Sequence, residues 1–321
     1  MTVLSGLVPI LATPFRGDGS LDLASLARLV EYQVTSGANG VATFGLASET
    51  FTLSARERRL VLDTVVRTAR AASAAMPVVA GIAATGLYPA VEQGKEAVDG
   101  GATVLMVLPP FLVRPGDDQL AEFFGELAAA VGVPVMMQDA PVLTGVPMSV
   151  RVIAEAGRVP GVDYVKIEAA PTAPKVAAVA STVASTVAST GAGGKLRVFG
   201  GQNAQFLLDE LDRGAVGTMP ACEFTDLLAE VMTAWDAGNR DEAEARFHRL
   251  LPLLVYGLQS GIAWAVHKQV LVRRGIIADA RVRAPARPLD AASAAGLLRL
   301  LRPLESEPGW QPGLGPGSEA H

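Results

Sequence analysis

Short apolar runs alternate along the chain with longer stretches in which apolar residues recur at helical spacing. The short runs are apolar on both faces, as expected of parallel strands that are covered on both sides. They predict strands at residues 7–13, 40–45, 77–82, 103–108, 134–140, 162–168, 197–201 and 215–220. The stretches between them predict helices at 23–35, 55–74, 89–99, 117–130, 149–155, 174–188 and 204–211.

This alternation predicts an α/β fold, a closed (β/α)₈ barrel over residues 1–222. An open doubly wound sheet is the alternative, but no G-x-G-x-x-G motif follows any predicted strand. Further helical patterns at 223–237, 240–258, 261–274 and 290–301 predict a C-terminal helical region, 223–303. Residues 304–321 are rich in Gly and Pro, which predicts a disordered tail.

Two local patterns refine the helix predictions. Ser54 and Glu57 have the spacing of a capping box, which predicts a helix start there. Residues 179–190 repeat Val-Ala-Ser-Thr three times, and so short a repeat indicates an extended helix end or loop.

Composition narrows the class of protein. Of 321 residues 50% are apolar and 18% charged, with a net charge of −5, which gives no support for nucleic-acid binding or a basic membrane anchor. Cys222 is the one cysteine and there are three histidines, so neither a disulfide nor a metal site is expected. The chain has no long uncharged apolar run and no basic leader, so we expect a cytoplasmic protein without a membrane span.

In a barrel, chemistry lies where the strands end, and the sixth predicted strand ends in Lys166 and Glu168. Lys166 is the only lysine within a predicted strand, and strand alternation gives Tyr164 and Glu168 the same face. Burial disfavours the charged amine, and a neutral amine can form a Schiff base with a ketone. The structural alternative is a surface lysine that pairs with Glu168.

Three other strand ends carry polar or glycine-rich loops. The loop after the second strand, with Ala47 and Ser48, can bind an anion through backbone N–H groups and hydroxyls. The fifth strand ends in Gln138, and each of these loops can equally be an ordinary turn. The seventh and eighth strands end near Gly201, Gln202, Asn203 and Met219, which we list as candidate substrate contacts.

Taken in order, several segments resemble the dihydrodipicolinate synthase / N-acetylneuraminate lyase family of class I aldolase-type enzymes. The matching segments over about residues 3–303 are 6–14, Gly45 with Glu49, the 141–145 turn, Val165-Lys166 and the 214–217 run. The resemblance implies a barrel with C-terminal helices, a homo-oligomer (tetramer or dimer), and a Schiff base between Lys166 and a 2-oxo acid. It also implies that the substrate carboxylate is held at Ala47 and Ser48, and that no cofactor is needed.

The sequence departs from the family pattern at its proton relay. The family's strand-five tyrosine falls on Gln138, its tyrosine after strand four on Leu112, and its arginine after the proline on Leu143. An amide cannot titrate, so Gln138 cannot replace a phenol as an acid or base.

The pair of Lys166 and Glu168 resembles the 2-keto-3-deoxy-sugar-acid dehydratases of this superfamily. We expect Glu168 to move a proton, with a pKa suited to that task by partial burial. A pyruvate-dependent aldolase or a dihydrodipicolinate synthase-like enzyme is the alternative within enzymes. A catalytically inactive barrel that binds a 2-oxo acid as a regulator is the alternative from another class.

Overall fold

The structure is a computed structural model that describes residues 3–190, 196–305 and 310. The chain divides into two compact units. The first unit contains the N-terminus up to Val8 and residues 77–220, and the second contains residues 9–76 and 221 onward.

The first unit contains seven parallel strands in the order β3-β4-β5-β6-β7-β8-β1. Their side chains are almost all buried, which explains why the runs are apolar on both faces. The strands are β1 (Gly6–Leu7), β3 (Val78–Ile82), β4 (Val104–Val107), β5 (Val135–Asp139), β6 (Val162–Ile167), β7 (Arg197–Gly200) and β8 (Gly217–Thr218).

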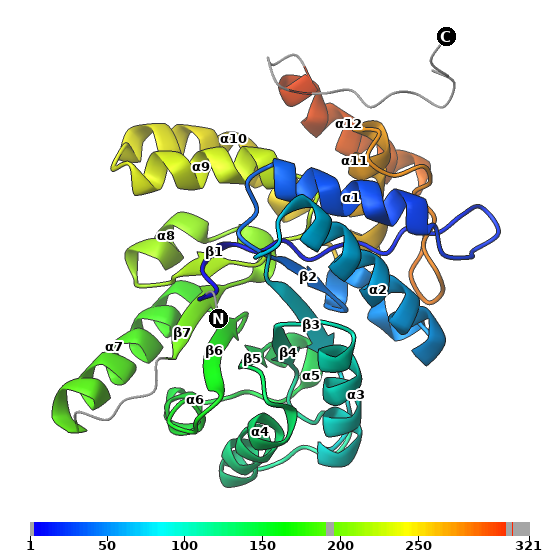
Figure 1. Cartoon of the computed structure of the whole chain (residues 1–321). Coiled ribbons are helices and arrows are strands. Elements are labelled where there is room, and N and C mark those ends of the chain that lie inside the picture. The colour runs from blue at the N-terminus through cyan, green and yellow to red at the C-terminus, as the bar shows by residue number, and fades with distance from the viewer. Residues whose placement is uncertain (1–2, 191–195, 306–309, 311–321) are drawn as a thin grey trace. The chain divides into compact units, whose positions relative to one another are not determined.

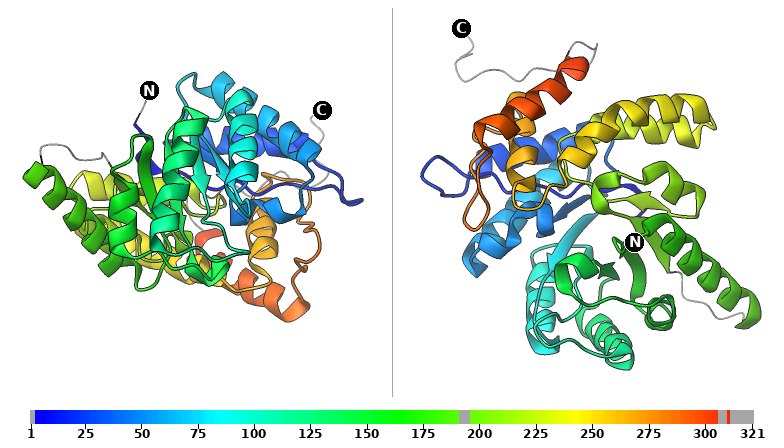
Figure 2. Two further views of the ribbon diagram at one scale, coloured as in Figure 1. Left: turned by 90° about the horizontal axis from the view of Figure 1, so that it is seen from below. Right: turned by 180° about the vertical axis from the view of Figure 1, so that it is seen from behind.

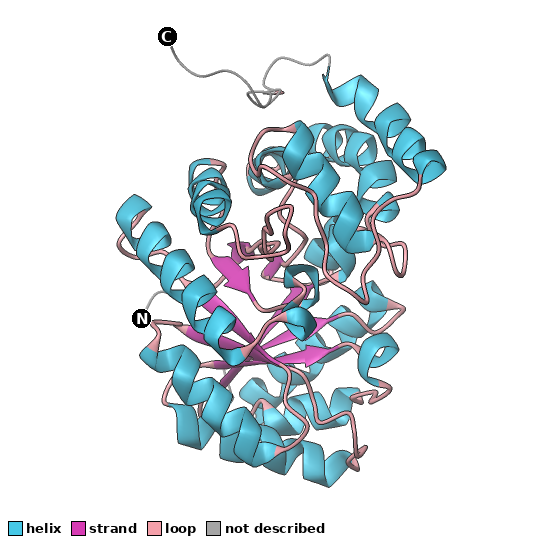
Figure 3. Ribbon diagram, turned by 90° about the vertical axis from the view of Figure 1, so that its right-hand side faces the viewer, coloured by secondary structure: helices cyan, strands magenta, loops and turns pink. Residues whose placement is uncertain are grey.

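The helices of the first unit cover the outer side of its strands (Figures 1 and 3). Helices α3, α4, α6, α7 and α8 pack successively against one another in chain order, as repeated β-α units require. They are α3 (Leu87–Asp99), α4 (Asp117–Val131), α5 (Pro141–Thr144), α6 (Val150–Ala156), α7 (Thr172–Thr190) and α8 (Leu207–Asp212), with a short 3₁₀ turn, η3 (Gln202–Ala204).

The second unit holds β2 (Val41–Thr43) and the remaining helices. Ile10 forms isolated parallel bridges to Ala42 of β2 and to Ala221. Helices α1 and α2 pack together, and α9 and α10 run side by side in both views of Figure 2. The elements are α1 (Leu23–Thr35), η1 (Leu46–Ser48), η2 (Thr50–Thr52), α2 (Ala55–Ala72), α9 (Thr225–Asp236), α10 (Arg240–Tyr256), α11 (Ala263–Arg273) and α12 (Ala291–Glu305).

Most predicted elements are present with small changes in their ends. The predicted start of α2 is confirmed, since Ser54 accepts from the Glu57 backbone while the Glu57 side chain accepts from the Ser54 backbone. The predicted strand 7–13 is largely wrong, because β1 ends at Leu7 and Pro9 has no amide hydrogen to donate to a ladder. The predicted strand 215–220 is reduced to β8, two residues long.

Two of the predictions concern segments of low sequence complexity, residues 179–190 and residues 304–321. The repeat at 179–190 forms the C-terminal half of α7, as a helix end. The predicted tail at 304–321 lies outside the described residues except for Leu304 and Glu305, which end α12 as helix rather than tail, and Trp310. The division into a barrel at 1–222 and helices at 223–303 stays a prediction. No described helix has both the length and the apolar content that crossing a membrane would need.

Candidate active site

Lys166 lies near the carboxyl end of β6, with Gln138 of β5 and Phe199 of β7 as its neighbours in register. It is almost completely buried, so it is not the surface lysine of the structural alternative. Tyr164 precedes it by two residues and faces the same way. The Tyr164 hydroxyl accepts a hydrogen bond from the Leu4 backbone N–H at 3.0 Å, and its ring packs edge-on to Phe199. Tyr164 therefore fills the interior below the lysine.

Glu168 follows β6 directly and joins three predicted site residues. Its Oε1 lies 3.3 Å from Lys166 Nζ. Gln138 Nε2 donates to its Oε2 at 2.7 Å, and the Gln202 backbone N–H donates to its Oε1 at 3.3 Å. Gln202 Nε2 also donates to the Glu168 carbonyl at 2.5 Å. The ends of β5, β6 and β7 thus bring together an amine, a carboxylate and two amides.

The electrostatics of Glu168 correct one expectation. Burial raises the pKa of its carboxyl, but the charge of Lys166 and the hydrogen bonds from Gln138 and Gln202 outweigh this effect, so the pKa is lowered. The prediction that partial burial tunes its pKa for proton transfer is wrong, because the neighbours stabilise the ionised form. Glu168 is therefore a carboxylate at neutral pH, ready to accept a proton.

The loop after β7 supports this carboxylate closely. A Cβ on Gly201 would lie 2.5 Å from Glu168 Cγ, so only glycine fits there. Gln202, Asn203 and Ala204 follow with positive φ angles, an unusual run for residues with side chains, and such strain concentrates at functional sites. Met219 is buried after β8, and its backbone N–H donates to the Gly200 carbonyl at 3.3 Å. Gly201, Gln202 and Met219 thus lie at the ends of β7 and β8, and Asn203 follows in the same loop.

Ala47 and Ser48 belong to the second unit, in the 3₁₀ turn η1 after β2. Ser48 is fully buried, and its hydroxyl donates to the Leu11 carbonyl at 2.6 Å. The Ser48 carbonyl accepts from the Thr13 hydroxyl, also at 2.6 Å. These bonds fix the turn against the segment that follows β1.

Sequence reasoning missed a buried ion pair in the second unit, between Glu49 and Lys268 of α11. Both side chains are fully buried. The Lys268 ammonium also donates to the Arg281 carbonyl at 2.7 Å and lies 4.2 Å from the centre of the Phe15 ring. Burial lowers the pKa of Lys268 to about 8, against the opposing effect of Glu49. Because its ammonium is fully engaged, this lysine holds the loop in place and is not a second nucleophile.

Helical spacing could have indicated the burial of Lys268, though not its pairing with Glu49. Lys268 lies one turn from Trp264 and from Leu271, so it falls on an apolar side of its helix. A second missed pair, Asp139 with Lys175 at 2.6 Å, ties the end of β5 to α7 in the first unit.

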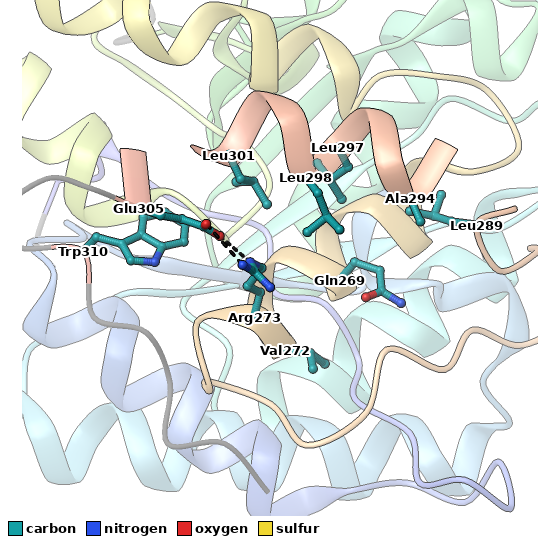
Figure 4. A pocket seen from close by; sticks show the side chains of 10 residues that line it. All are labelled: Gln269, Val272, Arg273, Leu289, Ala294, Leu297, Leu298, Leu301, Glu305 and Trp310. Carbon is teal, nitrogen blue, oxygen red and sulfur yellow. Dashed lines mark hydrogen bonds and ion pairs between the residues drawn. The ribbon is translucent and has the colours of Figure 1, made fainter. Parts of the chain in front are cut away.

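A pocket between α11 and α12 lies elsewhere in the second unit (Figure 4). It contains none of the predicted site residues. Its charged part is an ion pair between Arg273 and Glu305. It is otherwise lined by Gln269, Val272, Leu289, Ala294, Leu297, Leu298, Leu301 and Trp310. Lacking a nucleophile or a free carboxylate, it is not the candidate active site.

Comparisons with known proteins identify the family of this chain. The model of the dihydrodipicolinate synthetase family matches residues 3–302. The chain is 30% identical over 305 residues to an L-2-keto-3-deoxyarabonate dehydratase of Azospirillum brasilense, covering 94% of each chain. It is 31% identical to a 4-hydroxy-tetrahydrodipicolinate synthase of Acidiphilium cryptum, covering 77% of this chain and 81% of that one.

A solved structure agrees with the fold. The crystal structure of dihydrodipicolinate synthase from Rhodopseudomonas palustris superposes with a TM-score of 0.85 at 29% identity, covering 93% of this chain and 97% of that one. The predicted (β/α)₈ barrel followed by C-terminal helices is confirmed. The chain belongs to the dihydrodipicolinate synthetase family, and it is accordingly a lyase that works through a lysine Schiff base.

Proposed function

We propose that this protein removes water from a 2-keto-3-deoxy sugar acid, with Lys166 as the Schiff-base lysine and Glu168 as the group that moves the proton. The observation that carries the proposal is the Lys166–Glu168 pair, 3.3 Å apart, with Gln138 bound to the carboxylate. The relative from Azospirillum brasilense, named for such a dehydration, supports the choice.

The chemistry begins at Lys166. Its neutral amine attacks the C2 carbonyl, and loss of one water gives an iminium that withdraws electrons from C3. The Glu168 carboxylate then takes a proton from C3, and the resulting enamine expels the C4 hydroxyl. Glu168 holds the proton that this hydroxyl needs in order to leave as water. A second water hydrolyses the iminium and frees Lys166, so the net change is the loss of one water from the substrate.

Amides around the pair suit a neutral polyol. Gln138, Gln202 and Asn203 carry side chains that can both donate and accept, as sugar hydroxyls do. Gly201 and Met219 shape the same strand ends. The predicted binding of the substrate carboxylate by Ala47 and Ser48 stays a prediction.

A pyruvate-dependent aldolase is the second candidate, because it uses the same iminium and then breaks the C3–C4 bond. Relatives named 4-hydroxy-tetrahydrodipicolinate synthase keep this class open. Gln138 argues against a synthase, since an amide cannot pass protons as the family's tyrosine does.

The test is a panel of 2-keto-3-deoxy acids given to the purified protein, with both the dehydrated 2-oxo acid and pyruvate measured. A dehydrated product without pyruvate supports the proposal. Pyruvate release in its place would identify an aldolase, and an inert protein that still binds these acids would identify the regulator.

We also propose a homo-oligomer, a dimer or tetramer, in the cytoplasm. In the first unit, large apolar side chains lie exposed in the segments that follow β3, β4 and β5, namely the start of α3, the loop before α4, and α5. Such groups are typical of subunit contacts. They are Tyr88, Phe111, Leu112, Val113, Val142 and Leu143. Sedimentation of wild type against Leu112→Glu tests this, and a monomeric wild type would contradict it.

A further inference from the structure

A second carboxyl group, that of Glu210 in α8, lies against the strand end that supports Glu168. A Cβ built on Gly200 would collide with Glu210 Oε2, just as a Cβ on Gly201 would collide with Glu168. Successive residues of an extended strand face opposite sides. The two glycines therefore let two carboxyl groups approach β7, one on each side of its end.

Glu210 is buried with little polar support. It is 1% exposed, and within residues 3–190, 196–305 and 310 neither carboxyl oxygen meets a donor with good hydrogen-bond geometry. The Thr172 hydroxyl of α7, which also lacks a well-formed hydrogen bond, lies close enough to lower its pKa. A buried carboxyl in this state is costly unless it stays neutral. Such an exception in a native fold calls for an explanation beyond packing.

The groups that act on Glu210 include the candidate active site itself. Burial raises its pKa to about 7, against the effect of the Thr172 hydroxyl of α7. The charges of Glu168 and of Asp209 on its own helix raise the pKa further, and Lys166 lowers it. Interactions of this kind are mutual, so the charge on Glu210 also acts on Lys166 and Glu168.

We propose that Glu210 is a positioning residue that sets the charge of the Lys166–Glu168 pair from behind β7 and is neutral in the form of the protein that attacks a 2-oxo acid. The proposal rests on the Schiff-base function proposed above. With Glu210 neutral, the pair has no net charge. An ionised Glu210 adds a negative charge that holds the proton on Lys166, and the protonated amine is not a nucleophile.

The experiment compares wild type with Glu210→Gln, which keeps the shape of the side chain but cannot ionise. Pyruvate is the probe, and adduct formation is followed from pH 5.5 to 8.5 by reducing timed samples with borohydride at one common pH. We expect equal rates at pH 5.5. Above pH 7 the wild-type rate should rise less steeply, leaving Glu210→Gln about tenfold faster at pH 8.5, because only the wild type then carries the extra negative charge near Lys166.

Two further variants keep the result decisive. Asp209→Asn removes an exposed charge that raises the pKa of Glu210, so the change of slope in the pH profile should move to slightly lower pH without disappearing. Thr172→Val removes the hydroxyl that lowers the pKa of Glu210. The bend, which is the pH at which the adduct-formation rate begins to rise less steeply, should therefore move to higher pH. If Glu210→Gln and wild type share one profile, or if Glu210→Gln does not fold while Thr172→Val leaves the bend unmoved, the inference is wrong. If wild type forms no adduct, the proposed function fails instead.

Discussion

Two lysine–carboxylate pairs in this chain have the same charges and opposite surroundings. Lys268 and Glu49 are both fully buried, and the ammonium is also bound to a backbone carbonyl and an aromatic ring. Lys166 is equally buried, but its partner Glu168 keeps 19% of its side chain exposed and is held by two glutamines. The fully buried Lys268–Glu49 pair therefore holds a loop in place. The Lys166–Glu168 pair, which is open because its carboxylate is partly exposed, can contact a substrate.

The strongest test of this difference is to replace each lysine and to measure adduct formation and turnover. Lys166→Met should abolish the borohydride-trapped pyruvate adduct and lower turnover at least about 10⁴-fold, because the covalent route is lost. Intact mass after reduction is the readout. Wild type should carry the adduct in the peptide that contains residue 166. An adduct that persists in Lys166→Met, on Lys268 or elsewhere, would reverse the roles given to the two lysines.

The second prediction asks the same question of stability. Lys268→Met leaves Glu49 as an unpaired buried charge, and we expect the free energy of unfolding to fall by about 3–5 kcal/mol. Urea titration followed by circular dichroism measures it. Adding Glu49→Leu to Lys268→Met should recover much of the loss, since the orphaned charge is then gone. Equal losses for Lys166→Met and Lys268→Met would show that the two pairs do not differ as described.

The third prediction separates the carboxylate of the open pair from its lysine. Glu168→Gln keeps the shape of the side chain but cannot take the C3 proton, so turnover should fall about 10²–10³-fold while the pyruvate adduct still forms. Tyr164→Phe is the matched control, because it removes a hydroxyl on the same side of β6 that accepts from the Leu4 backbone and leaves the base in place. Full turnover in Glu168→Gln would assign the proton transfer to another group.

The two pairs also show which features of the structure can be predicted from the sequence. Lys166 was predictable because strand alternation is strict, and β6 spans Val162–Ile167 where 162–168 was expected. Helix α1 occupies the predicted residues, since its apolar spacing and its Asp22 cap agree. Glu49 was visible only as part of a family motif, and its burial with Lys268 depends on contacts between segments far apart in the chain.

The burial of Glu210 belongs with the features that local pattern does not determine. Its neighbours Phe206 and Leu207 place it beside an apolar side of a short helix, but nothing there says that its carboxyl meets a glycine. The lowered pKa of Glu168 was missed for a related reason. Its main cause is the charge of Lys166, and hydrogen bonds from Gln138 of β5 and from Gln202 in the loop after β7 add to it. Pairing of neighbouring strands alone does not give these hydrogen bonds.

The last prediction compares the two carboxyl groups that flank Gly200 and Gly201 by the pH dependence of stability. The pKa of Glu210 is raised in the folded protein from 4.5 to about 7, so between these values the folded state keeps a proton that the unfolded state has lost. The wild type should therefore lose stability as pH rises through this window, by about 3 kcal/mol in total, and Glu210→Gln should not. Glu168 has a lowered pKa, so its contribution to stability has the opposite sign. That contribution is present above the ordinary carboxyl pKa and is lost as pH falls through the folded-state value.

Urea midpoints from pH 3 to 8.5 for wild type, Glu210→Gln and Glu168→Gln measure both effects. Parallel curves for wild type and Glu210→Gln between pH 5 and 7.5 would mean that the buried carboxyl ionises as freely as an exposed one, and the contrast across β7 would be lost.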